Sequence, residues 1–155
     1  MIIRPTTKDL LAASLQELVA LKSIDKITVR EIAQNGGFTA KTFYNHFQDK
    51  YDLIAWIYSS SAEKIMNRIG IDGYEWRDAV RDSFRYFLDN REFLKNLVAN
   101  TSGQDSFINY VAQFSVKIVS DYIKRRNIAA GAAQKISLQK RKSVNQIYKI
   151  HRLDN

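Results

Sequence analysis

The chain lacks cysteine altogether, and it has only two histidines, at positions 46 and 151. Without cysteine, disulfides, thiolate catalysis and cysteine-ligated zinc sites are excluded. A single proline and six glycines argue against long disordered stretches. No apolar run approaches the roughly 20 residues of a membrane span, and residues 1–5 are too short and polar for a signal peptide. We therefore expect a cytoplasmic protein with no membrane partner.

Patterns that carry catalysis are also missing. The sequence has no glycine-rich phosphate loop and no paired metal-ligand spacing. Between residues 77 and 89 acidic residues alternate with arginines, which is typical of a solvated helix face with ion pairs. We predict that the chain is not an enzyme and that it needs neither a metal nor a cofactor.

The positive charge is concentrated in one part of the chain. The net charge over all 155 residues is +8. Residues 121–155 hold nine Lys/Arg against two Asp/Glu, whereas residues 61–120 hold eight of each. The overall basicity is thus a property of the tail and is weak support for binding to nucleic acid.

The most informative pattern lies between residues 27 and 53. Thr28 is a good N-cap, and Glu31 completes a capping box, so a helix begins here. The glycine pair at 36–37 ends that helix, because glycine adopts the left-handed conformation of a sharp turn. Thr39 caps a second helix, and Asp49 caps the next one. The second helix therefore cannot exceed about two turns.

This second helix has an apolar and a polar side. Phe43 and Phe47 lie one turn apart and can face inward. The residues left to face outward are Ala40, Lys41, Thr42, Tyr44, Asn45 and His46. A short helix with such a polar side has the dimensions of a DNA recognition helix in the major groove.

At these residues the chain resembles the DNA-binding domain of the TetR family of transcriptional regulators. The shared positions are Thr28, Ile32, Ala33, Gly37, Thr42, Phe43, Tyr44, His46, Phe47, Lys50 and Leu53. Gly36 departs from the alanine usual in the family and Thr39 from the commoner serine, but both residues are small and keep the turn chemistry. The resemblance ends near residue 60.

The resemblance implies a sequence-specific regulator that binds a near-palindromic DNA operator as a homodimer, with one recognition helix in each major groove. It implies that the phosphate backbone is bound by Tyr44, His46, Lys50, Thr28 and Thr39. It also implies that base edges are read by Ala40, Lys41 and Asn45. As alternatives, Tyr44 is a half-buried packing residue and His46 only caps the end of its helix.

We predict an all-α fold with three parts. A three-helix head at 1–48 is joined by a long helix to a regulatory and dimerisation domain at 49–126. The resemblance implies an effector cavity in that domain, and the aromatic residues that could line it are Trp56, Trp76, Phe84, Phe87, Phe107, Tyr110 and Phe114. Alternatively, these aromatic residues are ordinary core. Beyond the DNA-binding domain, the middle segment has Arg91-Glu92-Phe93-Leu94 and then Phe107-Ile108, and here it is similar to the branch of the family related to activators of dihydroxyacetone kinase operons. That resemblance implies that a protein co-regulator can replace the small effector.

Residues 127–155 form the third part, a basic tail with a thin apolar stripe. Either this tail forms a weak final helix or the usual C-terminus of the family has been lost. The tail also supports a rival function, in which the chain binds nucleic acid non-specifically through its basic residues.

Overall fold

A computed structural model describes residues 4–101 and 107–151 of the chain. Within this part all regular structure is helical, which confirms the predicted all-α class. The elements are α1 (Thr7–Leu21), the 3₁₀ turn η1 (Ile24–Lys26), α2 (Val29–Asn35), α3 (Ala40–Tyr44), α4 (Lys50–Met66), α5 (Trp76–Asp89), α6 (Arg91–Asn100) and α7 (Phe107–His151). The chain divides into two compact units, Met1–Ala112 and Gln113–Asn155.

The helix starts are those that the sequence predicts. The Thr28 hydroxyl accepts the Glu31 N–H, and the Glu31 carboxylate accepts the Thr28 N–H, so the capping box is formed. Thr39 caps α3 through the Thr42 N–H, and Asp49 caps α4 through two backbone N–H groups. These caps satisfy donors that have no partner within their own helix.

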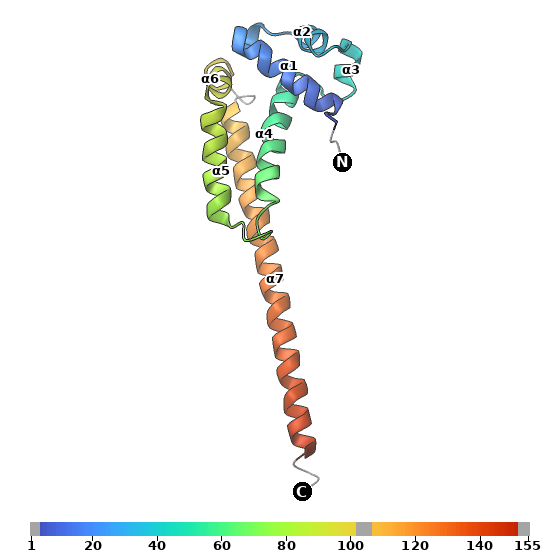
Figure 1. Ribbon diagram of the computed structural model, residues 1–155, viewed down its shortest axis with the longest axis vertical. Helices are drawn as coiled ribbons and strands as arrows, with labels where there is room; N and C mark the ends of the chain where they lie inside the picture. The colour runs from blue at the N-terminus through green and yellow to red at the C-terminus, as the bar shows by residue number, and fades with distance from the viewer. Residues whose placement is uncertain (1–3, 102–106, 152–155) are drawn as a thin grey trace. The chain divides into compact units, whose positions relative to one another are not determined.

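The first three helices form a small head around one apolar core, which lies at the top of Figure 1. α1 packs against α2, and α2 against α3. The fully buried side chains of this core include Leu11, Leu15, Ile32 and Phe43. Ser14 is the buried polar side chain among them, and its hydroxyl donates to the Ile32 carbonyl at 2.7 Å, so its burial leaves no unpaired donor.

α4 leaves the head and packs against α5, while α6 returns to contact both α1 and η1 (Figure 1). The regular helix of α4 ends at Met66. The turn that follows holds Gly70 and Gly73 at φ +88° and +75°, backbone conformations that residues with a Cβ rarely adopt.

α7 is a single helix from Phe107 to His151. The sequence left open whether the tail from residue 127 forms a weak final helix or has lost the usual end of the family, and in the structure the helix continues past residue 126 without a break. Residues 107–151 contain no proline, and alanine-rich residues at 129–133 favour helix more than most types do. Among the described residues, no helix combines the length and the apolar character that crossing a bilayer requires.

Candidate nucleic-acid interface

The short helix α3 is anchored to the head by two phenylalanines, Phe43 within the helix and Phe47 three residues after its end. Phe43 is 0% exposed and Phe47 is 3% exposed. Their ring centroids lie 5.7 Å apart, and the Phe47 ring meets Trp56 of α4 at 5.9 Å. Because both rings are buried, α3 has a fixed rotation about its own axis, and this rotation determines which residues face solvent.

The opposite side of α3 is open. Lys41, Tyr44, Asn45 and His46 are exposed, and Ala40 is half-buried. The Tyr44 ring leans edge-on against Phe43 with centroids 5.7 Å apart, yet 59% of the residue stays exposed. Tyr44 therefore combines the packing role with an accessible hydroxyl end. All four exposed residues are accessible to a DNA duplex, as the recognition-helix hypothesis requires. Their contacts with DNA stay a prediction.

The two threonines at the helix starts are already engaged in the free protein. Thr28 is held in the capping box, and its hydroxyl also donates to Glu31 at 3.0 Å. The Thr39 hydroxyl lies 3.1 Å from the Thr42 hydroxyl and accepts the Thr42 N–H. Both threonines are exposed at the start of their helices. Either hydroxyl would therefore have to bind a phosphate while it also keeps its capping hydrogen bond.

Lys50 occupies an unexpected position for a predicted phosphate contact. Its ammonium donates to the carbonyl oxygens of Ile24, Asp25 and Ile27 at 2.7, 3.1 and 2.9 Å. Partial burial lowers the pKa of this ammonium, and the carboxylate of Asp25 opposes that shift. The three hydrogens of the ammonium are thus committed to η1 and its C-cap. To bind a phosphate, Lys50 would have to release one of them, and its DNA contact stays a prediction.

Glu31 links the capping box to the end of α1. The Lys22 ammonium lies 2.6 Å from the Glu31 carboxylate. The hydrogen bond from Lys22, helped by the backbone and hydroxyl of Thr28, lowers the pKa of Glu31 to about 2. The carboxylate therefore stays charged throughout the neutral range and holds α2 against α1 there.

Part of the predicted effector set meets around one residue that the sequence reading left out. Tyr58 of α4 is buried, and its ring lies 6.2 Å from Phe87, 5.8 Å from Phe107 and 6.2 Å from Tyr110. The Tyr110 hydroxyl donates to the Ala55 carbonyl at 3.1 Å. These aromatic rings pack against one another, which fits the core alternative for this part of the set.

The rest of the predicted set is dispersed. Trp56 packs against Phe47 of the head, Trp76 is half-buried at the start of α5, and Phe84 is 67% exposed. Phe114 belongs to the second unit, residues 113–155, and is half-buried. Effector binding by these residues stays a prediction.

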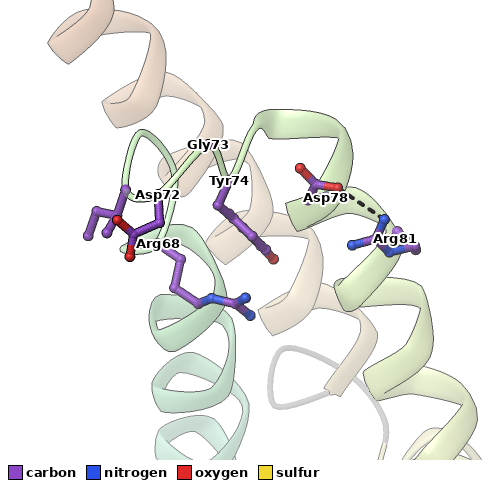
Figure 2. Close-up of a pocket in the computed structure, with 7 residues that line it drawn as sticks. Arg68, Asp72, Gly73, Tyr74, Asp78 and Arg81 are labelled. Carbon is purple, nitrogen blue, oxygen red and sulfur yellow. Dashed lines mark ion pairs between the residues drawn. The ribbon is translucent and has the colours of Figure 1, made fainter.

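The first unit has a pocket at a different place, the turn between α4 and α5 (Figure 2). This open pocket has a volume of about 340 Å³ and contains none of the predicted effector residues; its lining is Arg68, Ile71, Asp72, Gly73, Tyr74, Asp78 and Arg81. Its arginines are already paired: Arg68 with Asp82 at 3.1 Å, and Arg81 with Asp78 at 3.0 Å. The Arg68 guanidinium also lies 4.0 Å from the centre of the Tyr74 ring. The arginines of this open surface pocket are therefore neutralised by neighbouring aspartates, and neither arginine offers an unpaired positive charge to an anion.

One polar residue that connects the head to the body was missed by sequence reasoning. Asn96 of α6 bonds to the backbone of Val19, Lys22 and Ile24, more than 70 positions away in the chain. The available signal was a pair of asparagines one turn apart, Asn96 and Asn100, beside the apolar stripe of α6. Such a pair is common on a solvated helix, and only the tertiary structure shows that Asn96 bonds to the backbone of the head.

Comparison with known proteins agrees with this geometry. Residues 10–57 match the family described as bacterial regulatory proteins, tetR family. The chain is 24% identical over 120 residues to the HTH-type dhaKLM operon transcriptional activator DhaS of Lactococcus lactis subsp. lactis (strain IL1403). That alignment covers 77% of this chain and 64% of the relative, so the chain spans less than two thirds of the relative's length.

A solved structure, that of a dihydroxyacetone kinase operon activator DhaS, shares the fold. The TM-score is 0.57 at 23% identity, and the match covers 77% of this chain and 67% of the other. The regulatory family and this likeness together bear out the predicted helix-turn-helix head with a helical body. The match to a family of regulatory proteins agrees with the prediction that the chain is not an enzyme.

Proposed function

We infer, from the premise that residues 10–57 belong to the tetR family of bacterial regulatory proteins, that this chain is a DNA-binding transcriptional regulator. The observation that carries the proposal is the division of α3 into a buried side and an open side. Phe43 and Phe47 hold the helix in the head, and Lys41, Tyr44, Asn45 and His46 remain exposed. A short helix held in this way can enter a major groove without unpacking its own domain.

Within the interface we divide the contacts by chemistry. Lys41 and Asn45 lie one turn apart and carry groups that recognise guanine and adenine edges, and Ala40 can touch a thymine methyl. Tyr44 and His46, with Thr28, Thr39 and Lys50, would position the head on phosphates. Phosphate contacts set affinity and register, whereas the base contacts set the preferred sequence. A regulator that binds the chromosome would act in the cytoplasm.

We further propose that the active species is a homodimer on a near-palindromic operator. A single short recognition helix contacts few base pairs, and a dimer doubles the contacts while matching the symmetry of the site. α7 supports the proposal because its apolar residues Val116 and Ile123, two turns apart, are 69% and 50% exposed. An apolar stripe of this kind on a long helix is suited to a partner helix.

Control of the regulator would enter through residues 49–126, from a small effector or a protein co-regulator. The aromatic rings around Tyr58 support the first possibility only if they can part to admit a ligand. The exposed apolar side of α5 favours the second, since Phe84 and Leu88 are 67% and 66% exposed, one turn apart. A protein partner can cover such a surface without opening the core.

Selection of binding sites from random duplexes tests the proposed function. The full chain should enrich an inverted repeat, and fluorescence anisotropy should then show binding that survives excess non-specific DNA. A variant lacking residues 127–155 separates the proposal from tail-driven binding. If the shortened chain still forms dimers and still prefers the enriched site, the head reads the sequence. If no sequence is enriched and binding disappears with the tail, the chain is a non-specific binder and the proposal fails.

A further inference from the structure

The side chain of Asn96 joins the body to the head by three hydrogen bonds. Its amide nitrogen donates to the carbonyls of Val19 and Lys22, both at 3.1 Å. Its carbonyl oxygen accepts the N–H of Ile24 at 3.0 Å. Asn100, one turn further along α6, donates to the same oxygen at 3.2 Å and so helps to orient the amide. One half-buried side chain of α6 thus bonds both the end of α1 and the start of η1.

At the end of α1 the Lys22 N–H bonds to the Leu18 carbonyl, and the bonds from Asn96 serve the carbonyls of Val19 and Lys22 beyond it. A helix leaves its last carbonyls without partners inside the helix, and a glycine after the end often lets the backbone turn back to satisfy them. Here α1 is followed by Lys22 and Ser23 in extended conformations, with no glycine. Asn96 supplies the missing donor from another helix, so the end of α1 depends on where α6 lies.

The same turn is held from its other side by Lys50 of α4. The N–H of Ile24 bonds to Asn96, and the carbonyl of Ile24 bonds to Lys50 at 2.7 Å. The Ile24 side chain is fully buried. The turn η1, which connects α1 to the helix-turn-helix, is therefore hydrogen-bonded to α6 on one side and to α4 on the other. Directional hydrogen bonds on both sides restrict rotation as well as sliding, which apolar contacts alone do less well.

We propose that Asn96 is a positioning residue that sets the orientation of the DNA-binding head on the body and thereby the half-site spacing that the protein accepts. This inference rests on the proposed function as a dimeric regulator. In a dimer, the distance and angle between two recognition helices must match the operator, where each added base pair moves a half-site by roughly 3.4 Å and rotates it by about 34°. A head fixed on α6 accepts one spacing, and a head that pivots at η1 accepts several.

The test compares Asn96→Ala and Asn96→Asp with the full-length wild-type protein. The aspartate keeps the shape and the accepting oxygens but loses both donated bonds. Lys95→Ala is the matched control, because Lys95 is the exposed neighbour on α6 and pairs with Glu92 within its own helix. Each protein is titrated against the selected operator with its spacer lengthened or shortened by one and two base pairs, and against an isolated half-site.

Wild-type protein and the Lys95→Ala control should lose affinity about tenfold or more when the spacer changes, a penalty on the scale of one mismatched base pair. Both Asn96 variants should bind all the spacers within about threefold of one another, with half-site affinity unchanged, because a pivoting head loses selectivity for geometry and keeps its base contacts. If the variants keep the wild-type spacing preference, the proposal is wrong. It is also wrong if half-site affinity falls together with full-site affinity, since Asn96 would then only stabilise the head.

A second measurement does not depend on DNA and separates this proposal from the proposed function. The N–H of Ile27 bonds to the Ile24 carbonyl at 3.2 Å, whereas Asn96 bonds to the Ile24 N–H. In Asn96→Ala, hydrogen exchange should accelerate about tenfold or more at Ile27 as well as at Ile24, because the whole turn loosens. Acceleration at Ile24 alone would reject the positioning role. If wild-type protein binds no operator while Ile27 responds as expected, the regulator proposal fails and the coupling of η1 to α6 stands.

Discussion

Lys41 and Asn45 lie one turn apart on the exposed side of α3, where they project from the same surface as Tyr44. Their exposure follows from the burial of Phe43 and Phe47 on the other side, because a helix whose apolar residues are fixed presents its remaining residues in fixed directions. Lys50 shows the limit of this reasoning. It follows α3 in the chain, but the fold directs its ammonium inward onto three carbonyls.

Replacing Lys41 or Asn45 by alanine should alter which operator is preferred. Each loss of a bidentate base contact should reduce discrimination by about 1–3 kcal/mol at one base-pair position. Tyr44→Ala should instead weaken binding to all sequences, because a phosphate contact carries no sequence information. Anisotropy titrations against the selected site and its single-base variants separate these effects. If all three variants bind like the wild type, α3 is not the recognition helix.

Lys50→Ala should destabilise the head even in the absence of DNA. The substitution removes the charged donor from the carbonyls of Ile24, Asp25 and Ile27, of which the first keeps a bond from the Ile27 N–H. The loss of hydrogen bonds from a charged group should cost about 1–3 kcal/mol. Urea denaturation followed by circular dichroism measures the loss, and Lys41→Ala is the control, because Lys41 is exposed on α3. A variant as stable as the wild type, but with a shallower salt dependence of DNA binding, would show that Lys50 serves the phosphate backbone instead.

At the scale of elements, the head depends on caps that cross from one helix to another. Glu31 completes the capping box of α2 and pairs with Lys22 just after α1, so one carboxylate serves two elements. Asn96 and Lys50 do the same for η1 from α6 and α4. Short helices of five and seven residues gain little from propensity alone and rely on such contacts for their position.

The stability of the head should therefore decrease in acid through Glu31. Its pKa is about 2 in the folded protein and 4.5 in the reference state. Because the folded-state pKa is the lower one, the stabilisation is complete above about pH 4.5 and is lost as the pH falls toward 2. Glu31→Gln should be less stable than wild type at neutral pH, and the difference should shrink across this acid range. Thermal melts at a series of pH values measure the difference, and a gap that is constant with pH would contradict the assignment.

At the scale of the whole molecule, the described chain leaves apolar surface uncovered. Phe84 and Leu88 of α5 and Val116 and Ile123 of α7 are all at least half exposed. Exposed apolar residues repeating along a helix mark a surface that another chain can cover. A dimeric regulator needs such a surface to bind its second subunit, and a protein co-regulator would need one as its binding site.

Substituting glutamate for Val116 and Ile123 together should weaken self-association. Burying two charges in an apolar helix interface is unfavourable, so the dimer dissociation constant should rise by about tenfold or more. Sedimentation at micromolar concentration measures this change, and Lys117→Glu, an exposed neighbour on α7, is the control. A wild-type chain that stays monomeric would remove the basis of the dimer proposal, and a dimer unaffected by the double substitution would show that the subunits meet elsewhere.

The local features of this protein were determined by the sequence alone. The capping threonines, the glycine turn at 36–37 and the phenylalanines in and just after α3 act within a few residues, so their pattern predicted the head. The resemblance to the TetR family that they carry agrees with the family match over residues 10–57. The sequence left open whether a helix continues beyond residue 126, as α7 does, because propensity along a polar tail weakly separates helix from coil.

Only the tertiary structure decided which polar groups meet across the fold. Lys50 reaches carbonyls 23 to 26 positions away, and Asn96 reaches backbone 72 to 77 positions away. No spacing rule connects residues so far apart, since their proximity results from how α4 and α6 pack on α1. The same packing left Phe84 exposed and buried Tyr58 among the aromatic rings, two outcomes that the similar helical periodicity of α4 and α5 could not separate.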